Sequence, residues 1–133
     1  MSADWTTVQL WRKRDLNCLV EIQHSLLAYV DQTRDRGPHR WYIYVYIYPK
    51  HPLFSLFVGD SLFQEAVVNM PLHGGCSYLR WHFDNNGEIS SIQVGCDYDH
   101  CGDESRTYED VVDHLKYYQH DAQTLLDWLA NQF

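Results

Sequence analysis

The sequence contains no long hydrophobic run. Its longest aromatic and aliphatic stretch, WYIYVYIYP at 41–49, is rich in tyrosine and falls short of the roughly 18–20 apolar residues that a membrane-spanning helix needs. The N-terminal segment MSADWTTVQLWRKRD has no apolar core of the length found in signal peptides. We therefore expect a protein that does not enter membranes and that works in the cytoplasm.

The signatures of several familiar enzyme classes are missing too. There is no P-loop, no G-x-G-x-x-G and no G-x-S-x-G elbow. The segment DYDHCGD at 97–103 begins like a calcium loop, but Tyr108 stands where the bidentate glutamate belongs, which excludes an EF-hand. Nucleotide binding through a P-loop or Rossmann turn and hydrolysis through a serine elbow are excluded in the same way.

The four cysteines form no C-x-x-C pair, and the spacing from Cys96 to Cys101 does not match a zinc knuckle. In a cytosolic protein we expect Cys18, Cys76, Cys96 and Cys101 to be reduced thiols. A disulfide, a structural zinc site that combines Cys76, Cys96 and Cys101 with a histidine, and a Cys101–His nucleophile remain open alternatives.

Charge and length set further bounds. The 133 residues include 18 acidic and 10 basic side chains, for a formal net charge of −8. The length fits a single domain over residues 1–133, and the negative charge disfavours direct binding to nucleic acid. An acidic surface suits a basic partner instead, for example the nucleic-acid groove of another protein.

Two segments rich in β-branched and aromatic residues, 17–23 and 40–49, predict strands. In the second segment the aliphatic side chains alternate with a row of tyrosines, namely Tyr42, Tyr44, Tyr46 and Tyr48. The aliphatic set should face the core, so the tyrosines should line solvent or a groove. Two further alternating runs flank Asn85-Asn86-Gly87, which predicts a hairpin over 76–96. The segment 66–72 reads as another strand, after a short helix at 64–66 capped by Asp60 or Ser61.

The C-terminal segment has the periodicity of an amphipathic helix. Thr107 and Asp110 resemble a capping box, and apolar residues then recur at steps of three and four: Val111, Leu115, Tyr118, Ala122, Leu125 and Leu129. The predicted fold class is therefore α+β, with an antiparallel sheet of four to five strands packed by a long C-terminal helix.

Polar residues gather at the turns that should end these strands. Three histidines lie there, His51, His73 and His100, and the densest polar stretch, VGCDYDHCGD at 94–103, carries Asp97, Asp99 and Asp103. Imidazoles and carboxylates bind divalent transition metals, and Gly74-Gly75 can offer backbone N–H groups to an anion. The competing interpretation is that Asp, Asn and Gly at these positions cap turns and the last helix.

The three turns also carry an ordered series of motifs: YVYIYPKHPLF, PLHGGCSY and VGCDYDHCGD. Over residues 41–130 this series resembles a family of small bacteriophage and prophage proteins that has no established activity. The resemblance implies a shared set of positions: His51, Pro52, Leu53, His73, Gly74, Gly75, Tyr78, Gly95, Asp97, His100, Gly102 and Asp103. The chain departs from the family pattern at Ser77 and Cys96, where Thr and Phe are common, and in a longer segment before His73.

These observations lead to one principal expectation and two alternatives. The first is a small phage-type accessory protein with a site for a divalent metal or a phosphate-bearing small ligand, which would support hydrolysis. In this reading His51, His73, Asp97 and His100 bind the metal, Asp97, Asp103 and His100 act in catalysis, and Gly74, Gly75 and Tyr78 hold the ligand. The second is an acidic interaction protein that inhibits a host enzyme, such as a defence nuclease, in the host cytoplasm. The third is a virion or housekeeping protein whose polar turns serve only folding.

Overall fold

Five strands and one long helix make up most of the fold. The computed structural model describes residues 5–27, 39–59, 61–97 and 108–133, and the side chains of 11–25, 40–59, 61–97 and 115–133. In chain order the elements are β1 Trp5–Asp15, β2 Cys18–Leu27, β3 His39–Ile47, the 3-10 turn η1 Phe54–Leu56, α1 Glu65–Val68, β4 Tyr78–Phe83, β5 Ile89–Asp97 and α2 Tyr108–Ala130.

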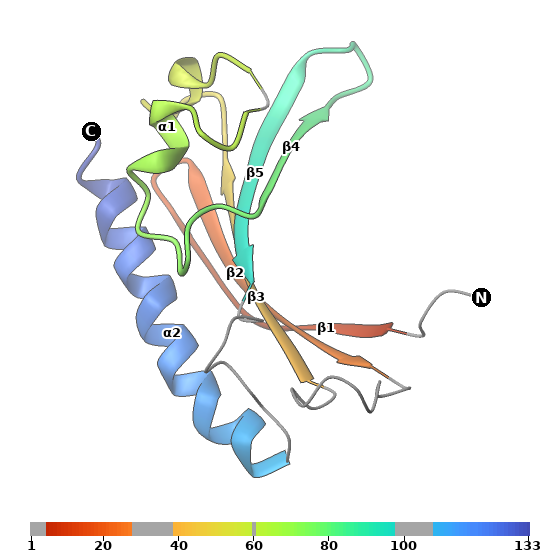
Figure 1. Cartoon of the computed structure of the whole chain (residues 1–133). Helices are drawn as coiled ribbons and strands as arrows, with labels where there is room; N and C mark the ends of the chain where they lie inside the picture. The colour runs from red at the N-terminus through yellow and green to blue at the C-terminus, as the bar shows by residue number, and fades with distance from the viewer. Residues whose placement is uncertain (1–4, 28–38, 60, 98–107) are drawn as a thin grey trace.

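The strands form one twisted sheet in the order β1-β2-β3-β5-β4, and every neighbouring pair is antiparallel. Helix α2 runs along one face of this sheet, and the segment that carries η1 and α1 lies near the C-terminal end of α2 (Figure 1). The predicted α+β fold, an antiparallel sheet packed by a C-terminal helix, is confirmed. Among the described helices, none has both the length and the apolar character to span a bilayer.

Two tight turns, one near each edge of the sheet, set the strand pairing, and both lie at the end of the sheet where β3 ends. In the predicted hairpin, Gly87 has a φ of 78°, and the Asp84 side chain accepts hydrogen bonds from the backbone N–H groups of Asn86 and Glu88. The β1–β2 turn holds Leu16 and Asn17 at positive φ, as two-residue hairpin turns require. This second hairpin, and β1 with it, was not predicted, because the Arg12-Lys13-Arg14 run hides the alternation of the strand.

The core lies between the sheet and α2. Alternate residues of the inner strands point to the helix. The helix packs against them with the apolar stripe predicted from its periodicity, and Tyr118, Ala122, Leu125 and Leu129 are all buried. Val111 and Thr107 of the predicted helix and cap lie outside the described side chains. Burial of this apolar area, at about 25 cal/mol per Å², is the main stabilising contribution to such a domain.

The segment between β3 and β4 differs from the prediction. The strand expected over 66–72 is wrong: Glu65–Val68 form α1, and the backbone N–H of Val68 donates to the carbonyl of Gln64 at 3.0 Å. Gln64, not Asp60 or Ser61, occupies the N-cap position, without a side-chain capping bond. A short apolar run has the same appearance in a buried strand and in a single helical turn, which explains the error.

Candidate functional site

The Gly74-Gly75 turn lies next to the end of β5. Both glycines have positive φ, 68° and 86°, and the backbone N–H of Gly75 donates to the Leu72 carbonyl at 3.0 Å. The chain then joins the sheet, since the N–H of Ser77 donates to the Gly95 carbonyl at 2.9 Å. The glycines are therefore needed for the backbone conformation of the turn, which delivers β4 to the edge of β5.

A small pocket of about 120 Å³ opens beside this turn, lined by Tyr42, Tyr44, Ser77, Tyr78, Cys96 and Asp97. Asp97 is half-buried and lies opposite Tyr42 in the β3–β5 register. The backbone of His73 hydrogen-bonds to the Cys96 thiol. The structure thus brings together four elements of the predicted site: the backbone of His73, the glycine turn, Tyr78 and Asp97.

His51 lies elsewhere. It follows the C-terminal end of β3, whereas Asp97 pairs with Tyr42 near the start of that strand. Its Nδ1 accepts from the backbone N–H of Leu53, and its Nε2 lies 3.1 Å from the Leu129 carbonyl of α2, to which it donates. Burial lowers the pKa of His51, while the hydrogen bond to Leu129 acts in the opposite direction. Both ring nitrogens are engaged in the fold, so the structure does not place His51 with the other predicted metal ligands.

The remaining predicted residues, His100 and Asp103, lie outside the described residues, as do Asp99 and Gly102. In the part of the chain that is described, no group of three or more His, Cys, Asp and Glu side chains could hold a metal ion. The metal site and its catalytic residues therefore stay predictions from the sequence.

The described cysteines are free thiols, and burial keeps two of them protonated. Cys18, Cys76 and Cys96 form no disulfide. Burial raises the pKa of the Cys18 thiol to about 11 and that of the Cys96 thiol to about 12. Because the thiolate is the nucleophile and the metal ligand, neither Cys18 nor Cys96 is poised for either role at neutral pH.

The most extensive surface feature is the sheet face opposite α2, which we call the tyrosine face: Tyr42, Tyr44, Tyr46, Tyr48 and Tyr78. Tyr42 and Tyr44 are stacked at 6.1 Å, Tyr44 meets Tyr78 edge-on at 5.4 Å, and the Tyr46 ring lies 6.1 Å from the ring of the neighbouring His82. No element within the described residues covers this face (Figure 1). The alternation of side chains in β3 predicted the four tyrosines from Tyr42 to Tyr48. Tyr78 belongs to the same face because it pairs with Gly95, which in turn pairs with Tyr44.

At the centre of this face, the absence of a side chain at Gly95 makes room for the Tyr44 ring. A Cβ atom at Gly95 would lie 2.5 Å and 2.8 Å from two ring carbons of Tyr44 and 3.0 Å from the Ile43 carbonyl. The Tyr44 ring therefore covers the sheet backbone where a side chain would otherwise stand. The close approach explains why a glycine occurs in the middle of a buried strand, where it normally costs stability.

Beside the rings, on the same face of the sheet, lies a polar network that sequence reasoning missed. The side chain of Glu21 is only 3% exposed, accepts hydrogen bonds from Nε and Nη2 of Arg12 at 3.0 and 2.5 Å, and also accepts one from Gln23. The hydrogen bond to Glu21, and then its charge, raise the pKa of Arg12. Buried carboxylates persist when they are paired and hydrogen-bonded in this way.

Two tyrosine hydroxyls of the face, those of Tyr44 and Tyr46, are held in their neutral form. Burial raises the pKa of Tyr44 to about 12, and burial, followed by the charge of Glu21, raises the pKa of Tyr46. At neutral pH both hydroxyls are consequently hydrogen-bond donors as well as acceptors. At the rim, the guanidinium of Arg14 lies 5.4 Å from the centre of the Tyr48 ring, and Arg80 is exposed.

No protein-family model, no curated protein and no solved structure matches this chain. The fold and the site are therefore described from their own geometry, and the resemblance to a phage and prophage family stays a prediction.

Proposed function

We propose that this protein is a binding protein whose tyrosine face docks onto a partner protein. The observation that carries this proposal is the row of five tyrosines, next to the buried Glu21, on a face of the sheet that no described element covers (Figure 1). Tyrosine supplies a large, rigid contact area at a small cost in conformational entropy, and it is enriched among the residues that dominate binding energies.

The side chains of the tyrosine face are already held in place by their neighbours, which favours binding to a partner protein. Tyr44 is wedged over Gly95 and against Tyr78, and the Nε2 of His82 donates to the side-chain amide oxygen of Gln93 at 2.7 Å. Side chains that are already ordered lose little entropy when a partner binds, so more of the contact energy appears as affinity.

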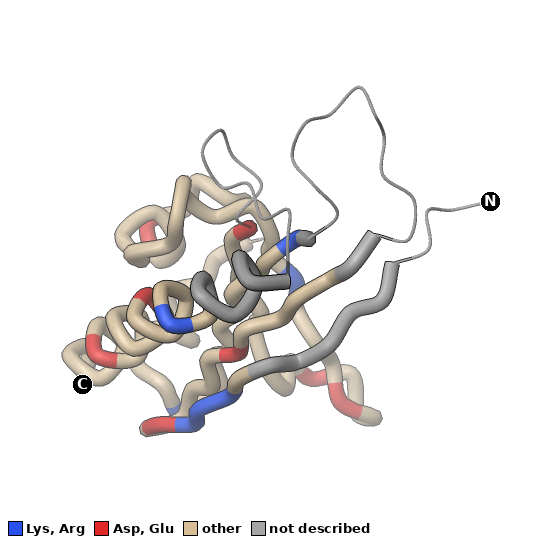
Figure 2. Tube along the Cα trace, turned by 90° about the horizontal axis from the view of Figure 1, so that it is seen from below, with Lys and Arg blue, Asp and Glu red and all other residues tan. Residues whose placement is uncertain are grey.

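Charge indicates what the partner presents. Acidic residues are spread over α1, α2 and the β4–β5 hairpin, whereas Arg12, Lys13 and Arg14 form one basic stretch at the end of β1 (Figure 2). At the rim of the tyrosine face Arg12 is already paired with Glu21, whereas Arg14 and Arg80 can complement acidic side chains of a partner. If the predicted phage context holds, the partner is a host enzyme, such as a defence nuclease, contacted through an acidic patch and not through its nucleic-acid groove.

Site-specific photo-crosslinking tests the proposal. A photoreactive phenylalanine analogue replaces Tyr46 on the face or, as a matched control, Tyr117, which is 53% exposed on α2. In cells of the source organism we expect a discrete protein adduct from position 46 and none from position 117. The adduct should disappear when Arg80→Glu is added, because the rim charge is reversed while the buried layer is left intact.

Three outcomes would overturn the assignment. Adducts of equal yield from both positions indicate nonspecific contact, and no adduct at position 46 removes the docking surface. A nucleic-acid adduct at position 46, reproduced with a short single-stranded oligonucleotide, would replace the protein partner by a nucleic acid, since aromatic rows also stack with bases.

A second candidate function is the metal-dependent or phosphate-binding site predicted from the sequence, and one observation favours it. Tyr78 and Asp97 line the 120 Å³ pocket, and the glycine turn leads into Ser77, another of its lining residues. If this function is present, Mn²⁺ or Zn²⁺ should raise the melting temperature of the wild-type protein. The Asp97→Asn variant should not respond, and an unchanged melting temperature of the wild type rules the metal out.

A further inference from the structure

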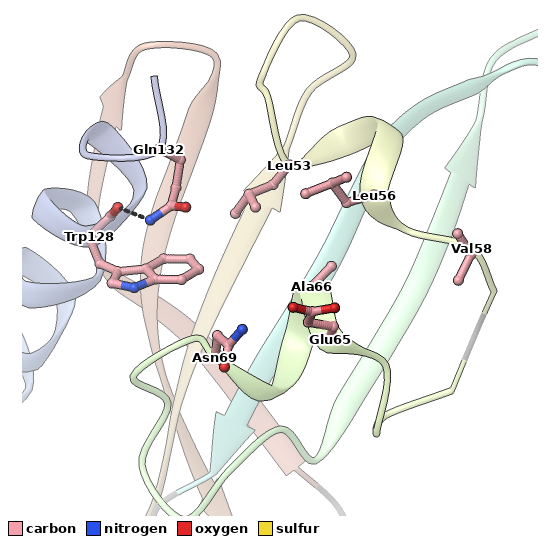
Figure 3. A pocket seen from close by; sticks show the side chains of 8 residues that line it. All are labelled: Leu53, Leu56, Val58, Glu65, Ala66, Asn69, Trp128 and Gln132. Carbon is pink, nitrogen blue, oxygen red and sulfur yellow. Dashed lines mark hydrogen bonds between the residues drawn. The ribbon is translucent and has the colours of Figure 1, made fainter.

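A second, larger cavity lies on the other side of the sheet, between the η1–α1 segment and the last turns of α2. Its volume is about 470 Å³, and its lining residues are Leu53, Leu56, Val58, Glu65, Ala66, Asn69, Trp128 and Gln132. Figure 3 shows these side chains arranged around one space, with Trp128 on the α2 side and Glu65 and Asn69 on the α1 side. The volume is within the range of about 300–1,000 Å³ that is typical of small-molecule sites.

The walls of the cavity are mostly apolar. Trp128 is half-buried, and Leu53 and Ala66 belong to the buried core. Leu56 is 56% exposed although its neighbour Leu53 is buried, which is the arrangement expected when a leucine borders an open cavity. The side-chain N–H of Gln132 donates to the Trp128 carbonyl at 3.0 Å and holds the chain end over the indole (Figure 3).

The lining contains a single charged group, the carboxylate of Glu65, and two amides, those of Asn69 and Gln132. Glu65 forms no ion pair with a described Lys or Arg side chain; the ion pair in the described part of the chain joins Arg12 and Glu21. A carboxylate on one wall of an otherwise apolar space attracts an organic cation through its charge, while the indole on the opposite wall offers an apolar surface to the rest of the ligand. The same carboxylate repels an anion.

We propose that this cavity binds a small amphipathic cation, an ammonium group carried on a short aliphatic chain. The methylene groups pack against Trp128, Leu53 and Leu56, and the ammonium group lies between the Glu65 carboxylate and the Asn69 amide oxygen. The cavity and the tyrosine face lie on opposite sides of the sheet, so this inference does not depend on the proposed function.

The test compares three probes that share a six-carbon chain: hexyltrimethylammonium, 1-hexanol and hexanoate. Binding is followed through the indole N–H resonance of Trp128, which is assigned by its loss in Trp128→Phe. We expect a saturable shift with hexyltrimethylammonium, an affinity for it about tenfold higher than for hexanol, and no shift with hexanoate. Added salt should reduce the preference for the cation, because Glu65 is exposed and its charge is screened.

Two variants separate the charge from the apolar contact. Glu65→Gln keeps the shape of the site and should lower the affinity for the ammonium probe to that of hexanol. Glu88→Gln removes another exposed carboxylate, near the β4–β5 turn and outside the cavity, and should change nothing. Equal binding of cation and alcohol to the wild-type protein, a preference that survives Glu65→Gln, or no shift with any probe would each overturn the assignment.

Discussion

One residue step along each strand separates two rows of side chains that this molecule uses in opposite ways. Val20, Val45 and Val94 lie side by side across β2, β3 and β5, face α2 and are fully buried. The next row, on the opposite face, consists of Glu21, Tyr44, Gly95 and Tyr78. The strands are the same in both rows, so the side chains alone determine what each face does.

The difference lies in how burial is achieved. Beneath α2, aliphatic groups are removed from water and need no partners, so their burial stabilises the fold directly. On the tyrosine face, Glu21 and Gln93 are 2% and 7% exposed, and each is tied to a side-chain partner, Arg12 and His82 respectively. Such networks add little net stability, but they fix one arrangement of the groups above them.

The largest effect is expected on the helix side. Leu125 is 1% exposed, and Leu125→Ala should reduce the free energy of unfolding by about 2–5 kcal/mol, because it leaves a cavity between α2 and the sheet. Tyr46→Ala on the tyrosine face should cost about 1 kcal/mol. Urea denaturation measures both values. Equal losses would show that the two faces contribute alike to stability and would break the comparison.

A smaller effect is expected where the tyrosine face meets the backbone. Gly95→Ala places a Cβ against the Tyr44 ring and should cost about 1–3 kcal/mol through overpacking. In a Tyr44→Ala background the same substitution should cost less, since most of the clash is gone. Gly59→Ala is the matched control, because its Cβ would meet no atom within 4 Å. If Gly95→Ala reduced the unfolding free energy equally with and without the Tyr44 ring, close packing of this ring on Gly95 would be refuted.

The smallest effect concerns the dependence of stability on pH. The pKa of His51 is lowered from its ordinary 6.5 by burial, so on acidification the unfolded chain takes up this proton before the folded protein does. The contribution of neutral His51 is complete above pH 6.5 and is lost as the pH falls from 6.5 through the folded-state pKa. Protonation of Nδ1 would also remove the acceptor for the Leu53 N–H.

Urea titrations between pH 5 and pH 7.5 measure this slope, a range that spans the ordinary pKa of histidine. His51→Gln should flatten the decline in unfolding free energy on the acidic side. His120→Gln, which alters an exposed histidine of α2, should leave the slope as it is in the wild type. An unchanged slope in His51→Gln would show that other groups govern the acid response.

The sequence predicted those features correctly that depend on a local pattern of residues. The alternation of Tyr and aliphatic residues in β3 predicted both faces correctly, Gly87 marked the hairpin turn, and the three-four spacing of α2 predicted its buried stripe. These signals are local and periodic, so tertiary context does not override them.

The missed features depend on contacts that are distant in sequence. The segment of β1 forms a strand because it pairs with β2. Across that pair, Arg12 lies opposite Glu21 and donates hydrogen bonds to its carboxylate. His51 was grouped with Asp97 because both follow strand-like runs, but its partner is Leu129, 78 positions away. A turn motif reports local conformation, and it does not report which end of the sheet a turn occupies.

The outermost position of β1 in the sheet bears on self-association. An outer strand exposes unpaired backbone groups to which a second molecule can add its own strand. Three consecutive cations, Arg12, Lys13 and Arg14, occupy this strand, and they are held by Glu21, Gln123 and the Tyr48 ring respectively. Two molecules that approached along their β1 strands would bring the unneutralised charges of Lys13 and Arg14 together, so the molecule carries its own electrostatic barrier to the pairing of these edges at low ionic strength.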